Sequence, residues 1–352
     1  MLKVKTIIKE GWPFIIAALV VFLTRLALHF PDITERVYSD GLYPLIAASL
    51  SSLSGLLPFS VWDVFWAVSI LILIAAIAAI FLKKISFRLF LLRYAQIFAL
   101  MLIWFYLSWG FNYFRPDLNK RMGFELSEVD EEVFRSSLDS IISLVNNNYF
   151  IILHDDYPEI DSAVEKSYSE NASLTDISYP NGSRRPKKMI FSNLIAKFGI
   201  SGYFGPFFNE INLNKKILPM EYPFLLAHEK AHQFGVGGEA DANLVAYLVC
   251  SESEDQRLRY SAAFCLMLYF FEDAQYLDDY RAYLESLDSR VLEELRFRQQ
   301  YYYGIQNEVM EKAHEKVYDA YLKGNNVAQG IDNYNKVVEL YISWKARSSM
   351  QF

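Results

Sequence analysis

The sequence predicts a mainly α-helical protein in two parts, with three transmembrane helices followed by an α-rich domain that contains a small β-sheet. Long apolar runs are confined to the first third of the chain, and the composition becomes that of a soluble protein after residue 115. Apolar residues in the second part recur mostly at helical spacing. At 352 residues the chain has room for a membrane anchor over 1–115 and one globular domain over 116–352.

The three apolar runs cover residues 12–30, 61–82 and 94–111. Each approaches the length of about 20 residues that a helix needs to cross a bilayer. Lysines precede the first run, and Lys83 and Lys84 follow the second, so the positive-inside rule places both flanks in the cytoplasm. The N-terminus is then cytoplasmic, and an odd number of spans places the second part on the extracytoplasmic face. We expect a multi-pass protein of the cell membrane.

Two charged residues lie close to the predicted outer ends of the spans. Arg25 lies towards the end of the first span and Asp63 at the start of the second, so their side chains are expected to form a pair at the same membrane face. Charged residues near an interface more often pair or extend towards water than mark a transport pathway. The stretch 43–58 between them is apolar but rich in Ser and Gly, and it is expected to lie in the outer interface as a short helix.

The net charge of −7, with no basic cluster in the second half, argues against nucleic acid as a partner. The two cysteines, Cys250 and Cys265, match no metal-ligand spacing and are expected to be buried small apolar side chains. His29, His154 and His314 each lack a second histidine at helical spacing. We expect these three histidines to be structural or solvated.

The segment 223–250 contains the pattern H-E-x-x-H, formed by His228, Glu229 and His232 on a predicted helix. Residues four apart project from one helix face, so both imidazoles can bind one tetrahedral cation while Glu229 stands beside it. A catalytic zinc takes such ligands, keeps one position for water and lowers the pKa of that water towards about 7. The spacing predicts Zn²⁺ bound by His228 and His232, with Glu229 as the catalytic base.

A third protein ligand has to come from a separate element. Gly237 and Gly238 interrupt the helical pattern after His232, and the next predicted helix begins with Glu239. Glu239 is therefore favoured as the third metal ligand, and Asp241, two positions further on, is the less favoured alternative. Asn243 lies one turn after Glu239 and is expected to support the ligands from behind.

Several segments together resemble the bacterial family labelled domain of unknown function 3810. They are PFSVWD (58–63), WGFNYFR (109–115), GPFFNEINLN (205–214), HEKAHQFG (228–235), EADANLVAYLVC (239–250), VYDAYLKGNN (317–326) and QGIDNYNKVVEL (329–340). The resemblance covers nearly the whole chain and implies a zincin-like metallopeptidase domain anchored in the bacterial cell membrane. Lys230 departs from the apolar residue that is commoner inside such motifs, which bears on the exposure of the helix.

The function expected from these observations is peptide-bond hydrolysis by a zinc-activated water, with a peptide or protein as substrate and the lipid bilayer as a second partner. Glu210, Asn212 and Asn214 belong to E-I-N-L-N, whose period of two is typical of a strand. We expect an exposed edge of this strand to bind the substrate backbone. Tyr334 and Asn212 are candidates for stabilising the oxyanion.

Two other interpretations remain open. One is a non-catalytic membrane receptor or scaffold that retains the zincin fold, which cleavage assays would distinguish from a peptidase. The other is an intramembrane protease, which requires the metal-binding helix to lie inside the bilayer. Protease protection of the second part in vesicles of opposite orientation would test it.

Overall fold

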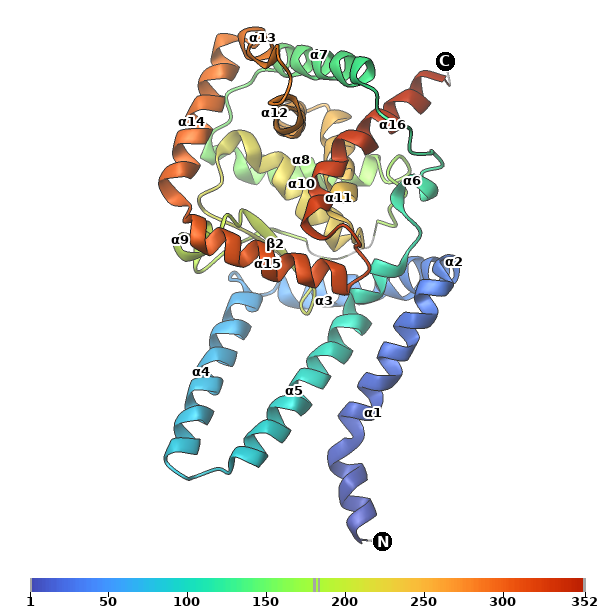
Figure 1. The fold of residues 1–352 in the computed structure, drawn as a ribbon, viewed down its shortest axis with the longest axis vertical. Coiled ribbons are helices and arrows are strands. Elements are labelled where there is room, and N and C mark those ends of the chain that lie inside the picture. Colours follow the sequence, from blue (N-terminus) through green and yellow to red (C-terminus); the bar gives the residue numbers. More distant parts are fainter. Residues whose placement is uncertain (1, 180–181, 183, 351–352) are drawn as a thin grey trace.

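The structure is a computed structural model that describes residues 2–179, 182 and 184–350, without the side chains of 2–9, 331, 334–335 and 348–350. Figure 1 shows a mainly helical body from which three long helices project on one side. The three are α1 (Leu2–His29), α4 (Val61–Phe81) and α5 (Phe87–Ser108). The N-terminus and the α4–α5 turn both lie at the end of the long helices that is away from the body (Figure 1).

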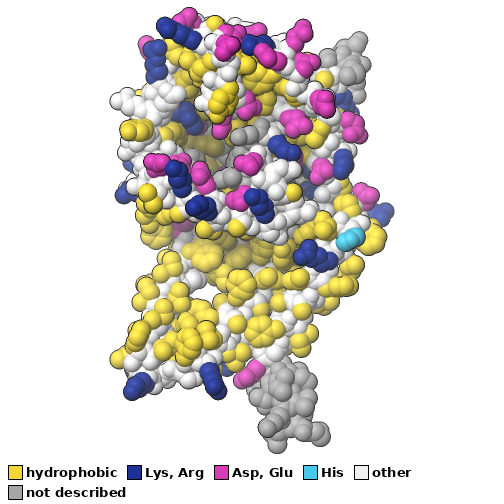
Figure 2. All heavy atoms as spheres, in the orientation of Figure 1, with side chains coloured by type: hydrophobic (Ala, Val, Ile, Leu, Met, Phe, Trp, Pro, Cys, Tyr) yellow, Lys and Arg dark blue, Asp and Glu magenta, His cyan; other side chains and the backbone are white. Residues whose placement is uncertain are grey.

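Each long helix contains a stretch that is long and apolar enough to cross a membrane, namely Glu10–His29, Val61–Phe81 and Phe87–Ser108. Figure 2 shows their surface as a nearly continuous apolar region below the more charged body. The third helix begins earlier than the predicted residue 94, because the Ser86 side chain caps it by accepting a hydrogen bond from the Leu89 N–H. It ends at Ser108 rather than at 111, where the chain tightens into the 3-10 helix η2 (Gly110–Phe114).

Three short elements connect α1 to α4. They are α2 (Pro31–Thr34), the π-helix η1 (Glu35–Leu42) and α3 (Tyr43–Ser54). In Figure 1, α3 runs across the ends of the long helices that adjoin the body. The predicted short helix within 43–58 is therefore present, and its 12 residues are too few to cross a bilayer.

The predicted pair of Arg25 and Asp63 is wrong. Asp63 is buried, and its carboxylate accepts hydrogen bonds from the Ile190 N–H at 2.6 Å and from the Tyr203 hydroxyl. Arg25 is exposed, and among the described residues it forms no ion pair. The prediction considered only the two spans and could not include partners from the second part of the chain.

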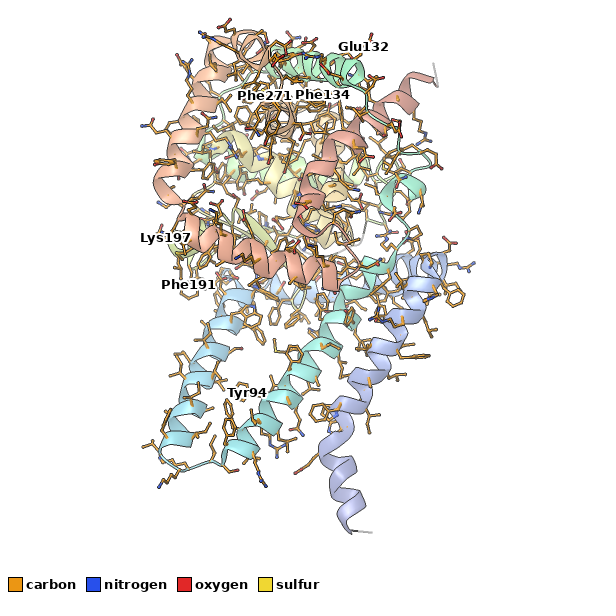
Figure 3. All side chains as sticks on the ribbon, viewed as in Figure 1. Tyr94, Glu132, Phe134, Phe191, Lys197 and Phe271 are labelled. Atoms are coloured by element: carbon orange, nitrogen blue, oxygen red, sulfur yellow. The ribbon has the colours of Figure 1, made fainter. Side chains whose placement is uncertain are left out.

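The body is built around α10 (Tyr222–Gln233) and α11 (Glu239–Ser251), which pack against each other at its centre. The remaining helices are α6 (Leu118–Arg121), α7 (Glu131–Asn147), η3 (His154–Asp156), α8 (Tyr157–Glu170), α9 (Ser192–Ile195), η4 (Ala196–Phe198), η5 (Pro219–Glu221), α12 (Gln256–Ala274), α13 (Tyr280–Glu285), α14 (Ser289–Ile305), α15 (Glu308–Gly324), η6 (Gly330–Lys336) and α16 (Val337–Met350). Figure 3 shows Phe134 of α7 and Phe271 of α12 where these two helices meet, with Glu132 at the outer surface. The core thus follows the predicted helical spacing of apolar residues.

The small sheet has three strands in the order β1 (Lys187–Lys188), β3 (Glu210–Leu213) and β2 (Gly202–Gly205). β1 is parallel to β3, and β2 is antiparallel to it. The strand predicted from E-I-N-L-N is therefore present as β3. It is the central strand, however, so the prediction that it offers an exposed edge is wrong, and β2 forms the edge beside α10.

The turn between β2 and β3 packs against both α4 and α5. Trp104 of α5 donates its indole N–H to the Phe207 carbonyl oxygen at 3.0 Å. On the other side, the ring centroid of Phe207 lies 5.2 Å from that of Trp62, and the centroid of Phe208 lies 5.7 Å from that of Phe65. Aromatic contacts of this kind hold the β2–β3 turn against two of the long helices.

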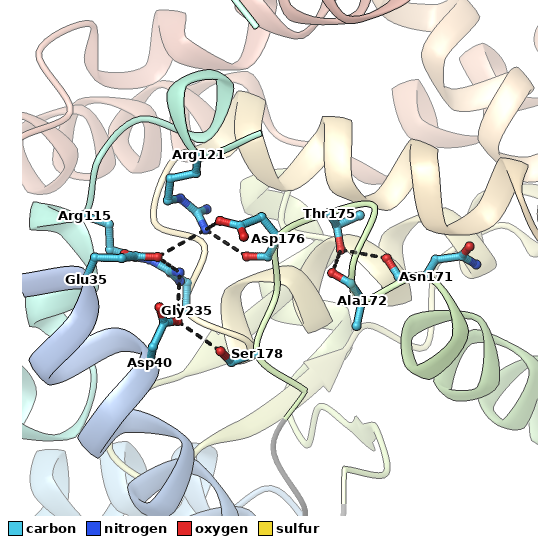
Figure 4. A network of polar contacts seen from close by, with 10 residues as sticks. All are labelled: Glu35, Asp40, Arg115, Arg121, Asn171, Ala172, Thr175, Asp176, Ser178 and Gly235. Carbon is cyan, nitrogen blue, oxygen red and sulfur yellow. Dashed lines mark hydrogen bonds and ion pairs between the residues drawn. The ribbon is translucent and has the colours of Figure 1, made fainter. Parts of the chain in front are cut away.

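A polar network joins η1 to the loop that follows α10 (Figure 4). Arg115 donates to both carboxylate oxygens of Glu35, at 2.6 and 2.5 Å, and to the Gly235 carbonyl oxygen at 3.0 Å. Arg121 extends the network to the Asp176 backbone oxygen at 3.0 Å. Although composition changes near residue 115, the packing does not divide there, since one hydrophobic cluster contains Tyr43, Trp109 and Phe114 together with Leu322 of α15.

Candidate metal centre

The centre depends on how the chain turns between α10 and α11. Pro223 near the start of α10 suits a first helical turn, and apolar residues up to Ala227 bury the helix. The helix ends after Gln233, and Gly235 has a φ of +87°, which favours glycine. α11 then begins at Glu239, where the Ala240 N–H donates to the Asn333 side-chain oxygen at 3.0 Å.

This turn brings His228, His232 and Glu239 together. The two Nε2 atoms lie 3.2 Å apart, and Glu239 Oε2 lies 3.2 Å from Nε2 of His228 and 3.3 Å from Nε2 of His232. Zinc ligands at about 2.0–2.1 Å with tetrahedral angles are separated by roughly 3.3 Å. All three side chains are buried and can offer one atom each to a metal ion, so the residues present fit a tetrahedral cation.

The side-chain atoms that point away from the three ligand atoms also have hydrogen-bond partners. His228 Nδ1 lies 2.7 Å from the Asn243 side-chain oxygen, and His232 Nδ1 lies 2.8 Å from the Val236 carbonyl oxygen. Both contacts leave Nε2 of each ring to face the shared point, as in metal-binding histidines. The Tyr318 hydroxyl of α15 donates to the other carboxylate oxygen of Glu239. Asn243 therefore lies where the sequence placed it, whereas Tyr318 was not predicted.

The electrostatics of the centre favour a cation between the three groups. Burial alone would raise the pKa of Glu239, but His232 and His228 hold that pKa well below its usual range. Burial would lower the pKa of His232, yet Glu239 and Glu229 raise it to about 9. Without a metal, the Glu239 carboxylate thus keeps His232 protonated. A bound metal ion would supply the same positive charge.

The side chain of Glu229 extends from α10 towards the edge strand β2. A β-carbon on Gly202 would lie 2.6 Å from Glu229 Oε1, so only glycine leaves room for the carboxylate. Burial raises the pKa of Glu229, and the neighbouring histidines and a hydrogen bond from the Phe204 backbone oppose this rise. A carboxyl group with a raised pKa beside a metal is suited to accept and return a proton.

Asp241 lies outside the three-residue cluster. Burial raises the pKa of its carboxyl group to about 6, while Arg121 and Arg115 oppose the rise. Its Oδ2 atom lies against Gly238, where a β-carbon would be 2.9 Å away. Of the two acidic candidates, the structure brings only Glu239 to the histidines.

Of the three residues predicted to bind substrate, Glu210 and Asn214 have internal hydrogen-bond partners, and the Asn212 side chain is buried without one among the described residues. Glu210 accepts from the Trp62 N–H at 2.6 Å and from the Lys187 ammonium group at 2.6 Å. Asn212 is fully buried and pairs with Tyr203 across the sheet, on the face opposite to the one by which Gly202 reaches Glu229. This position also removes Asn212 as an oxyanion candidate.

Asn214 donates to the carbonyl oxygens of Ser192 at 3.1 Å and Ile200 at 3.0 Å, which makes it a loop brace. The side chain of Tyr334, the other oxyanion candidate, lies outside the described residues. Lys230 is buried, and its ammonium group binds Glu165 and the Arg184 carbonyl oxygen. A local sequence pattern cannot reveal such a pair, because Glu165 lies on α8, 65 residues earlier in the chain.

The remaining cysteine and histidine predictions concern side chains away from the centre. Cys250 and Cys265 are buried and free, as predicted. His29 is exposed, with Nδ1 2.8 Å from the Arg25 carbonyl oxygen. His154 and His314 lie against the rings of Tyr157 and Tyr318. None of these three histidines belongs to a group of potential metal ligands among the described residues.

Two contacts tie the end of α10 to the first part of the chain. The Trp109 indole N–H donates to the His232 carbonyl oxygen at 2.7 Å, and the Tyr43 hydroxyl donates to the Gln233 carbonyl oxygen at 2.6 Å. A helix leaves its last carbonyl groups without partners inside the helix. Residues from α3 and from the end of α5 thus complete the C-terminal end of α10.

A cavity of about 390 Å³ lies near the centre, although His228, Glu229, His232 and Glu239 do not line it. Ser201, Leu225 and Tyr269 form part of its lining. Ser201 precedes Gly202, and Leu225 lies one turn before Glu229 on the same helix face. Burial raises the pKa of the Tyr269 hydroxyl. A hydrogen bond with Asn243 opposes this rise, and the charge of Glu239 adds to it. The cavity therefore lies between α10 and α12, beside the residue that leads into β2.

Comparison with known families gives one match, to a family model described as "Protein of unknown function (DUF3810)", over residues 38–342. No curated protein and no solved structure matches the chain.

Proposed function

Since the chain belongs to the DUF3810 family and its centre lies within the matched residues, we propose that it is a membrane-anchored zinc metallopeptidase that hydrolyses peptide bonds. The observation that carries this proposal is the triangle of His228, His232 and Glu239, with ligand atoms 3.2–3.3 Å apart. Glu229 stands on the same helix beside them. Three protein ligands and one open position are typical of a catalytic rather than a structural zinc.

Each residue has a defined part in the proposed reaction. His228, His232 and Glu239 hold the metal, and Asn243 and Tyr318 orient two of these ligands. Bound zinc would polarise the substrate carbonyl and make a water molecule acidic. Glu229 takes the proton from that water and returns it to the leaving amine, a role that suits a buried carboxylate with a raised pKa.

The substrate would extend the sheet at β2, because β2 is the edge strand and its Gly202 lies directly against Glu229. An extended peptide that pairs with an edge strand receives its affinity from backbone hydrogen bonds. The neighbouring cavity would then accept one side chain of the substrate. Its lining combines the apolar Leu225, Leu268 and Phe271 with the charged Glu221, Glu272 and Arg298.

We place the centre outside the cytoplasm. Lys83 and Lys84 lie in the α4–α5 turn, at the same end as the N-terminus (Figures 1 and 2). The positive-inside rule assigns that end to the cytoplasm. The body, which lies at the opposite end of the three helices, would then face the extracytoplasmic side.

The test uses the full chain purified in lipid nanodiscs, with zinc measured by elemental analysis and cleavage measured on unfolded peptides. We expect about one zinc per chain and cleavage by the wild type. Glu229→Gln should keep the zinc and abolish cleavage, since it removes the proton acceptor without touching a ligand. Cleavage that survives Glu229→Gln would contradict the role of Glu229.

The non-catalytic alternative predicts a different result in the same experiment. A receptor or scaffold that retains the fold would bind zinc without cleaving any peptide in the wild type. Zinc without cleavage over a broad library of unfolded sequences would therefore favour the scaffold.

A further inference from the structure

Apolar side chains are exposed at the base of the body, outside the three long helices. In the segment 190–194, Ile190, Phe191 and Leu194 are 44%, 44% and 53% exposed. Figure 3 shows Phe191 close to the level at which α4 begins. We propose that the segment 190–194 inserts into the surface of the lipid bilayer and holds the β2 edge against it, so that the substrates are peptide segments lying at the membrane surface. This inference rests on the proposed function.

The position of the segment argues for lipid as its partner. The Ile190 N–H donates to Asp63 at 2.6 Å, so the segment is bound to the first turn of a helix apolar enough to span a membrane. α3 continues the same apolar surface, with Leu45 and Leu53 68% and 65% exposed, and Leu56 beyond it is 79% exposed. A soluble face rarely presents so many large apolar side chains together.

Charge supports the same partner. Exposed basic residues adjoin the segment along the chain, namely Arg185, Lys188 and Lys197. The exposed Lys215 also lies beside it, since its backbone N–H donates to the Ser192 hydroxyl at 3.2 Å. Figure 3 places Lys197 further from the long helices than Phe191. Apolar side chains directed into lipid with lysines at headgroup level are typical of a surface that rests on an anionic membrane.

The segment is linked directly to the site. Asn214 donates to the Ser192 carbonyl oxygen at 3.1 Å and to the Ile200 carbonyl oxygen at 3.0 Å, and the Asn214 N–H donates to the Ser201 carbonyl oxygen at 2.8 Å. Ser201 leads into β2, whose Gly202 lies against Glu229. Since β2 and the segment share this brace, a bilayer that receives the segment also lies beside the edge strand. A substrate that reaches β2 from the membrane surface is already close to its binding position.

The first experiment measures the lipid contact independently of catalysis. Phe191→Cys and Tyr276→Cys are labelled with a nitroxide in nanodiscs of phosphatidylcholine and phosphatidylglycerol. The native cysteines are buried and should remain unlabelled, and Tyr276 is 84% exposed on the body. We expect the label at 191 to be accessible to oxygen and protected from a water-soluble nickel chelate, and the label at 276 to show the reverse. Equal accessibility at both positions would overturn the proposal.

The second experiment tests the substrate class. One peptide sequence is offered either free in solution or carrying a lipid chain that tethers it to the same nanodisc. Phe191→Ser with Leu194→Ser should lower kcat/KM for the tethered peptide on the order of tenfold, through the loss of local concentration, and leave the free peptide unchanged. Leu144→Ser, an exposed leucine on α7, is the matched control and should affect neither.

The two experiments separate the two proposals. An equal loss for both peptides would mean that the segment supports the fold of the site, and it would contradict the substrate class. If the wild type cleaves neither peptide, the proposed peptidase function fails, while the accessibility of the label at 191 still decides whether the segment contacts lipid.

Discussion

Glu239 distinguishes a metal site from two histidines that share a helix face. It reaches both imidazoles because the glycine-containing turn returns the chain to α10, whereas Asp241 lies outside the cluster. We expect Glu239→Ala to lose most of the bound zinc and Asp241→Ala to keep nearly one equivalent. Elemental analysis of both variants, after circular dichroism has established that they fold, gives the answer. Normal zinc in Glu239→Ala together with its loss in Asp241→Ala would transfer the ligand role to Asp241.

Tyr318 supports the carboxylate that completes the proposed ligand set. Its hydroxyl donates to the Glu239 oxygen that does not face the histidines. Tyr318→Phe removes only this donor, and outer partners of this kind typically contribute 10–100-fold to metal affinity or activity. We expect zinc affinity, measured by competition with a chelating dye, to fall by about tenfold. Tyr303→Phe, at a side chain that is 90% exposed, should leave the affinity unchanged.

At this scale the sequence predicts what local spacing determines. Residues four apart share a helix face, so the two histidines could be placed, and Asn243 could be placed one turn after Glu239. Tyr318 stands 79 residues from Glu239, and no spacing rule joins two helices across such a distance. The burial of Lys230 could not be predicted for the same reason, since its partner Glu165 belongs to another helix.

Among the elements, β2 has the closest relation to the proposed chemistry. A β-carbon at Gly202 would lie 2.6 Å from Oε1 and 3.0 Å from Cγ of Glu229, so Gly202→Ala has to displace the whole side chain. Because a displacement of about 1 Å can cost on the order of 100-fold in rate, we expect kcat/KM to fall by roughly 10–100-fold. Zinc content should stay normal, since the ligands are untouched.

The matched control for this change is Gly304→Ala. A β-carbon at Gly304 would have nothing within 4 Å, so this variant should cleave peptides at the wild-type rate. If Gly202→Ala retained full activity, Glu229 would not depend on the shape of β2 for its position.

The sheet shows how far an element can be predicted from its own residues. The alternation in E-I-N-L-N correctly indicates a strand, because side-chain alternation is local. The order of strands depends on which segments meet in space, and β1 is only two residues long. Such a short strand carries no pattern of its own, so the central position of β3 could not be recognised.

For the whole molecule, the network around Arg115 joins the two parts of the chain. The guanidinium group binds the Glu35 carboxylate and the Gly235 carbonyl oxygen, and the two charged side chains are 5% and 16% exposed. Removing one member of a buried pair costs about 3 kcal/mol, so Arg115→Ala should lower the unfolding temperature measured in nanodiscs. Arg281→Ala breaks an exposed pair with Glu285 and should change it little. Equal unfolding temperatures for Arg115→Ala and the wild type would contradict this coupling.

Composition predicts the two parts of the molecule but not how they are joined. The change after residue 115 reflects where apolar side chains are exposed on the surface of the long helices. It does not reflect which residues pack together, since Trp109 and Tyr43 bind the end of α10 from the other side of that boundary. Hydropathy predicts, for each segment separately, whether its surface faces lipid or water. It does not predict which segments contact each other in the folded chain.

The bonds from Trp109 and Tyr43 to α10 also have a consequence for biosynthesis. Trp109 precedes His232 by 123 residues and Tyr43 precedes Gln233 by 190, so both leave the ribosome well before the helix that they complete. Trp109 directly follows α5, and Tyr43 begins α3. Both donors are therefore already present in the chain when α10 is synthesised. The end of α10 can be completed at once, so we expect the centre to assemble onto a first part of the chain that has already been made.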